Sequence, residues 1–155
     1  MEQIFEGDPY YGPSVLGALE DVTANLAIRK PPWSAHSIWE LVLHLAAELN
    51  YAREVINGTA GPWIEGETTW PTITDVSEIA WQSAIEELIK ANQALICAVE
   101  QLDDTILNKQ PTQVRGPYYL MLHGTMQHNI FHSGQISLLT GQEGIINSKN
   151  ANEPK

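Results

Sequence analysis

The sequence is short of several residue types and patterns, and each shortage excludes a class of protein. It contains one cysteine, Cys97, so no disulfide can form within the chain, and a reducing compartment fits this usage. No apolar run approaches the ~20 residues that a membrane-spanning helix needs. The acidic first residues, MEQIFEGDPYYG, show neither a signal peptide nor a transit peptide. We therefore expect a cytoplasmic protein without a membrane-spanning segment.

Positive charge is also scarce. Lysine and arginine together number 8 against 19 aspartates and glutamates, which gives a formal net charge of −11 over 155 residues. A chain of this charge is repelled by phosphate backbones and by anionic lipid surfaces. Nucleic acids and membranes are therefore not expected as partners. The hydrophobic fraction, 43%, and the charged fraction, 17%, are ordinary for a globular domain with its own core.

The apolar pattern that is present has the period of α-helices, and no strand pattern or internal repeat competes with it. We expect four helices, over residues 13–29, 37–57, 75–103 and 118–140. Ser37 and Glu40 have the spacing of a capping box at the start of the second helix. Gly58 and Gly141 follow the second and fourth helices as stop signals.

Four amphipathic helices in one chain predict an all-α fold, a four-helix bundle. The longest connection, residues 58–74, is rich in Gly, Pro, Thr and Trp. A connection of this length can cross the bundle, so the second and third helices need not be antiparallel neighbours. We expect a single domain over residues 1–145 and a disordered tail over residues 146–155.

The histidines raise the main question about function. His128 and His132 lie four residues apart, so on a helix their directions differ by only about 40°. His44 occupies the same kind of buried position on the second helix. His123 points about 180° away from His132, and His36 precedes its helix. A buried imidazole without a partner costs a few kcal/mol, so three inward histidines need an explanation.

A metal ion explains them, because three neutral imidazoles with one open position are a common catalytic zinc arrangement. Imidazole also suits nickel, iron and copper. If the second and fourth helices are neighbours, His44, His128 and His132 can converge on one ion. The alternative is that each histidine hydrogen-bonds separately to a neighbour in the core.

Several residues near these histidines are candidates for supporting roles. Glu48 lies one turn after His44 and is the best candidate for a base or a carboxylate that supports the ligands; a solvent-exposed carboxylate is the alternative. Gln135 is a candidate to hydrogen-bond a metal-binding imidazole; a partly exposed amide without such a role is the alternative. Gly134 either admits a close approach of backbone or ligand, or serves in packing alone.

Aromatic residues and the cysteine complete the candidate set. Tyr51, Trp63 and Trp70 are candidates to line the mouth of a site, although loop tryptophans also cap cores. Cys97 lies among apolar residues of the third helix and is expected to be a buried packing thiol. Trp81 is expected at a helix surface, where an apolar side chain favours self-association.

Two segments resemble the signature segments of the DinB-like superfamily, the damage-inducible, YfiT-like group of metal-binding four-helix bundles. They are HSIWELVLHLA at 36–46 and HNIFHSGQISLL at 128–139. YYGPS at 10–14 and a tryptophan in the middle loop, Trp63 or Trp70, fit the same layout. The resemblance implies a divalent metal, typically nickel or zinc, held by His44, His128 and His132. It also implies a homodimer.

The resemblance leaves two readings of the function. Some members of the superfamily are thiol-dependent transferases that use bacillithiol, mycothiol or glutathione, and others are described as metal-dependent hydrolases. The first reading is therefore a metal-dependent transferase or hydrolase that acts on a small molecule. The second is a non-catalytic metal-binding stress-response protein. The low number of cations, with Arg29, Arg53 and Arg115 the only arginines, favours the second reading, because these thiols carry carboxylates.

Overall fold

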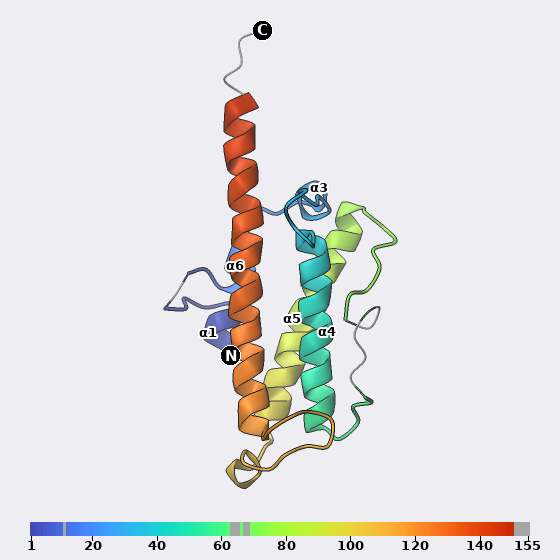
Figure 1. The fold of residues 1–155 in the computed structure, drawn as a ribbon, viewed down its shortest axis with the longest axis vertical. Helices are drawn as coiled ribbons and strands as arrows, with labels where there is room; N and C mark the ends of the chain where they lie inside the picture. Colours follow the sequence, from blue (N-terminus) through green and yellow to red (C-terminus); the bar gives the residue numbers. More distant parts are fainter. Residues whose placement is uncertain (11, 63–65, 67–68, 151–155) are drawn as a thin grey trace.

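Three long helices packed side by side form the body of the protein (Figure 1). This computed structural model describes residues 1–10, 12–62, 66 and 69–150, with residues 142–150 described by their backbone. The long helices are α4 (Ile38–Ile56), α5 (Glu78–Glu100) and α6 (Tyr118–Asn150). Three short α-helices and one 3-10 turn, η1 (Asp104–Ile106), accompany them, and no strand occurs among the described residues. The predicted all-α class is confirmed.

The two central helices begin at caps that satisfy their free backbone N–H groups. Ser37 accepts a hydrogen bond from the N–H of Glu40, and the Glu40 carboxylate accepts one from the N–H of Ser37. The predicted capping box of α4 is therefore confirmed, and Gly58, at φ +70°, follows the last turn as expected. Helix α5 begins three residues later than predicted: Ser77 caps it by accepting from the N–H of Ala80, and Asp75 accepts from the N–H of Ser77.

The crossover between α4 and α5 makes these two helices parallel neighbours. In Figure 1 both run downwards, and the chain returns from the bottom of α4 to the top of α5 before α5 starts. The third long helix, α6, runs in the opposite direction and packs against α4. The predicted long crossover is confirmed.

The helix predicted over residues 13–29 is wrong as a continuous element. The structure has two one-turn helices there, α2 (Val15–Ala18), capped by Ser14, and α3 (Ala24–Ala27), capped by Thr23. Between them Asp21 adopts φ 62°, a left-handed conformation that ends a right-handed helix. The apolar residues of this segment are nevertheless buried or partly buried, because the two turns present them to the same core. A further short helix, α1 (Glu2–Phe5), buries Phe5 against this core.

Helix α6 is longer than its sequence indicates. Its predicted end at Thr140 is wrong, since the backbone stays helical to Asn150. Gly141 has no positive φ, so it does not form the cap that would stop the helix. The helix crosses the predicted boundary between domain and tail at residue 145, and the disorder of residues 146–155 stays a prediction. No helix in the described part of the chain is both long and apolar enough to cross a membrane.

Trp81 ties α5 to the N-terminal segment. Its side chain is fully buried against Trp39, and its indole N–H donates to the backbone oxygen of Val22 at 2.7 Å. The expectation that Trp81 is a surface residue favouring self-association is therefore wrong. The position falls on the same face as Ala84 and Leu88, which are also buried.

We expect Trp81→Phe to lower the free energy of unfolding by about 2–4 kcal/mol, because it creates a cavity and leaves the Val22 carbonyl without its donor. Trp33, which is 54% exposed, provides the control, and Trp33→Phe is expected to change stability little. Urea denaturation of both variants measures the difference. Equal losses in the two variants would contradict the anchoring role of Trp81.

Candidate metal centre

The three histidines selected from the sequence meet in the structure. His44 lies in the middle of α4, while His128 and His132 lie one turn apart on α6, which contacts α4. The ligand nitrogens of the three side chains all lie within 4.8 Å of one another, an arrangement that can hold a metal ion. His44 and His132 are buried and His128 is partly buried.

The same ring nitrogen of each histidine faces the centre of the cluster. Nε2 of His128 lies 3.2 Å from Nε2 of His44 and 3.0 Å from Nε2 of His132. Tetrahedral zinc with Zn–N bonds of ~2.0–2.1 Å holds its nitrogen ligands about 3.3 Å apart. The spacing in the cluster is therefore close to that of nitrogens sharing one ion.

The opposite nitrogens of two of the rings have fixed partners. Nδ1 of His44 lies 2.7 Å from the backbone oxygen of Thr69, and Nδ1 of His132 lies 2.6 Å from Oε1 of Gln135. A carbonyl oxygen only accepts, so His44 must donate from Nδ1, which leaves a lone pair on its Nε2. The same reasoning holds for His132 with the amide of Gln135 as it is placed here. The predicted hydrogen bond between Gln135 and an imidazole is confirmed, with Gln135 as the acceptor.

These assignments leave the cluster without enough protons for its nitrogens. With lone pairs on Nε2 of both His44 and His132, the only proton available inside is one on Nε2 of His128. A single N–H cannot donate fully to two nitrogens on either side. At least one buried lone pair then lacks a partner, which costs free energy. A cation at the centre would satisfy all three nitrogens, so the donor set fits a metal.

Burial keeps the cluster neutral. Burial first, and neighbouring imidazoles in addition, lower the pKa of His128 and His132 to about 4, whereas the hydrogen bond to Gln135 acts in the opposite direction at His132. Burial also lowers the pKa of His44, against the effect of its bond to Thr69. The three rings are therefore uncharged near pH 7, which is the state that coordinates metals.

The crossover loop closes one side of the cluster. Trp70 stacks on His44 with ring centroids 3.9 Å apart and planes 1° from parallel, and His36 stacks on its other face at 3.6 Å. Thr69, which holds His44, is itself buried and accepts a hydrogen bond from the N–H of Gly66 at its side-chain oxygen. The loop thus shields and orients one imidazole. The other candidate tryptophan, Trp63, lies outside the described residues.

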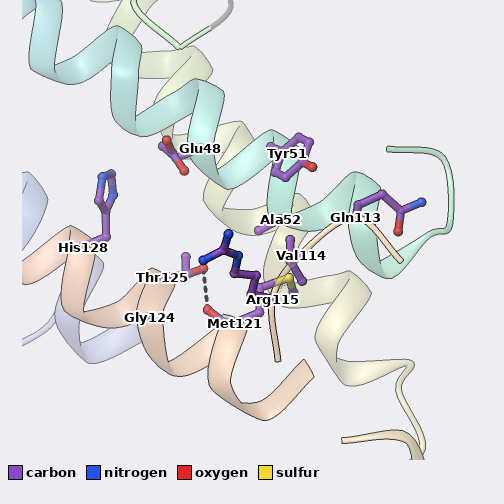
Figure 2. Close-up of a pocket in the computed structure, with 10 residues that line it drawn as sticks. All are labelled: Glu48, Tyr51, Ala52, Gln113, Val114, Arg115, Met121, Gly124, Thr125 and His128. Carbon is purple, nitrogen blue, oxygen red and sulfur yellow. Dashed lines mark hydrogen bonds between the residues drawn. The ribbon is translucent and has the colours of Figure 1, made fainter. Parts of the chain in front are cut away.

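Glu48 lies beside the cluster, as its sequence position suggests. Its Oε1 is 3.9 Å from Nε2 of His44, one turn earlier on α4. Burial raises the pKa of this carboxyl from 4.5 to about 7. Figure 2 shows Glu48 and His128 on facing helices at one end of a pocket, with Tyr51 farther along α4. A carboxyl that titrates near neutral pH can both take up and release a proton there.

The remaining candidates fall away from the cluster. His123 is exposed and its ring lies 6.1 Å from that of Tyr119, on another face of α6. Cys97 is exposed, so the prediction of a buried thiol is wrong. It lies on α5 two residues after the buried Leu95, on a different face of the helix. Gly134 is also exposed, and nothing lies within 4 Å of the position a Cβ would occupy. Of the two readings of this glycine, the close approach of backbone is not found.

Sequence reasoning missed the contributions of two loops. Thr69 binds His44 through its backbone oxygen, so its side-chain identity gave no signal. Arg115 lies in the loop before α6 and lines the pocket beside His128; no periodic pattern extends to it. Only its status as one of three arginines marked it out.

Comparisons with protein-family models, with curated proteins and with solved structures found no match to this chain.

The pKa values of the cluster predict how metal-free protein responds to acid. Unfolded histidines titrate near pH ~6.5, whereas folded His128 and His132 titrate at about 4. Between these values the unfolded state binds more protons, so stability falls as the pH falls. Glu48 acts oppositely, because its folded pKa of about 7 lies above 4.5, and its contribution is lost as the pH rises. Because two histidine pKa values are lowered and one carboxyl pKa is raised, the net effect is that stability falls as the pH falls.

We therefore expect the Tm of chelator-treated protein to fall between about pH 6.5 and pH 4. His128→Gln should reduce this slope, because one depressed pKa is removed, while His123→Gln on the exposed face should leave it unchanged. Thermal melts across the pH range measure the effect. A Tm that rises on acidification, or a slope that His128→Gln does not alter, would contradict the neutral, buried cluster.

Proposed function

We propose that this chain is a DinB-like, metal-dependent enzyme that holds one divalent cation, nickel or zinc, on His44, His128 and His132. The observation that carries the proposal is the convergence of three Nε2 atoms with too few protons between them. The segments around these histidines resemble DinB-like signatures, which supports the same ligand set. Two rigid helices supply the ligands, and this favours a site that persists through repeated binding of a substrate.

The chemistry we propose is transfer of a low-molecular-weight thiol or hydrolysis of an activated bond. A divalent cation supplies Lewis-acid chemistry, because it polarises substrate oxygens and lowers the pKa of a nucleophile. The protein holds the ligand nitrogens in place through Thr69 and Gln135, which keep their protons on the far side of the rings. Trp70 and the loop around it exclude water from the His44 side.

Glu48 is the residue that we propose to move a proton in this reaction. Its carboxyl is close to the cluster and faces a cavity. Its pKa of about 7 suits a general base, since such a group is partly ionised at neutral pH and still basic enough to accept a proton. The pocket beside the cluster favours an enzyme over the alternative, a non-catalytic metal-binding stress-response protein, because storage of an ion needs no cavity for a second molecule.

The ligand set makes a sharp prediction for single histidine variants. We expect wild-type protein to bind a single metal ion per chain, and His44→Ala, His128→Ala and His132→Ala each to lose most of that binding. His36→Ala and His123→Ala should retain it, because neither ring nitrogen belongs to the cluster. Elemental analysis of untagged protein measures the stoichiometry. Loss of metal in His123→Ala together with retention in His44→Ala would reject the assignment.

The role of Glu48 predicts a variant that keeps the metal but loses activity. Metal-loaded protein is assayed with a panel of thiols, electrophiles and activated esters, and turnover is expected to vanish on chelation. Glu48→Gln should retain the metal and slow turnover by about 10²–10⁴-fold. Glu54→Gln, the same change farther along α4, serves as control. Absence of turnover across the panel would support the non-catalytic alternative instead.

The homodimer and the cytoplasmic location stay predictions. Trp81 no longer supports self-association, but other apolar side chains are exposed along α6, where they provide a candidate surface for a second copy: Tyr119, Leu120, Ile130, Phe131 and Leu138.

A further inference from the structure

The pocket that adjoins the histidine cluster has its own chemical character. Its volume is about 390 Å³, within the range of small-molecule sites, and His128 and Glu48 form one end of it. The walls between the two helices are mainly apolar, with Ala52 on α4 and Met121 on α6. Gly124 contributes no side chain, and a Cβ there would meet nothing within 4 Å. The pocket is therefore shaped for an apolar body next to the cluster.

One cation lines this mainly apolar pocket. Arg115 extends from the loop before α6, and in Figure 2 its side chain points towards Thr125 and Glu48 across the pocket. No described carboxylate forms a salt bridge with Arg115, although Lys30 and Lys90 are both paired. The Arg115 side chain is exposed, so it can meet the carboxylate of an occupant without first breaking a salt bridge. Its five N–H donors match a carboxylate in shape.

The polar groups around Arg115 define how much charge an occupant can carry. Glu48, at the far end of the pocket, repels a second negative charge. Gln113 is held by a hydrogen bond from its side-chain amide to the oxygen of Ala60, and Thr125 donates to the oxygen of Met121. Neither residue adds a positive charge. Arg115 can therefore neutralise one anionic group of an occupant, and no other lining residue can neutralise a second.

We infer that the pocket binds a small molecule with one carboxylate and an apolar body, whose carboxylate pairs with Arg115 while the body packs against Met121 and Ala52. The role of this molecule as the substrate rests on the proposed function, whereas its binding does not. Arg115 is then the residue that determines specificity, since it selects the charged over the uncharged form of one molecule.

The first test compares matched probes on full-length protein after chelation, so that no metal can bind the carboxylate. Benzoate, phenylacetate and phenylbutyrate are each titrated against the uncharged amide of the same acid by calorimetry. We expect at least one carboxylate to bind about tenfold or more tightly than its amide. Arg115→Gln should abolish the difference. Lys109→Gln, which removes the same charge from the same loop, should preserve it.

A second pair of variants tests whether binding occurs inside the pocket. Gly124→Leu fills the space with a side chain and also favours the helix, by about 1 kcal/mol, so misfolding is not expected. It should weaken the carboxylate and the amide alike. Gly141→Leu makes the same change at an exposed position of α6 and should weaken neither.

The outcomes separate this inference from the proposed function. Failure of every carboxylate to bind more tightly than its amide, or a preference that survives Arg115→Gln, overturns the inference whatever the metal content. Carboxylate selectivity that depends on Arg115 upholds the binding site even if elemental analysis finds no metal. In that case the proposed function alone has failed.

Discussion

The hydrogen bond between Nδ1 of His44 and the backbone oxygen of Thr69 is the contact on which the site depends. It requires the crossover loop to pass directly over the middle of α4, and the parallel arrangement of α4 and α5 makes such a loop necessary. The bond fixes the tautomer of His44 and turns its Nε2 inward. Trp70, the next residue, then stacks on the same ring. One loop thus determines both the orientation and the shielding of one imidazole of the cluster.

The rest of the cluster follows from helix geometry and burial. His128 and His132 share a face of α6, and that face packs on α4 where Leu41 and Leu45 are fully buried. Helices in a packed core hold side chains more precisely than loops do. The same burial that stabilises the core removes water from the imidazoles and lowers their pKa. Burial therefore both stabilises the fold and keeps the imidazoles neutral. It also leaves at least one nitrogen lone pair without a hydrogen-bond partner, which costs free energy.

The sequence predicted the convergence of the three histidines better than the fold around them. Helical spacing selected the three histidines, because two elements with strong apolar periodicity carry them. The N-terminal segment was misread, since periodicity reports which residues are buried but not the break that Asp21 introduces. Trp81 was predicted to be exposed and is buried, and Cys97 was predicted to be buried and is exposed. Both predictions are wrong because the segments that pack on α5 are distant in sequence. The contact between His44 and the backbone oxygen of Thr69 could not be predicted, because any residue offers the same backbone oxygen.

The most direct measurement is long-range proton–nitrogen NMR of the histidine side chains, recorded on metal-free protein and after addition of zinc. The account predicts that His44 and His132 carry their proton on Nδ1 before zinc is added. Zinc should then shift Nε2 of these two and of His128, and leave His36 and His123 unchanged. A proton on Nε2 of His44 in metal-free protein, or a zinc-induced shift at His123 in place of His44, would contradict it.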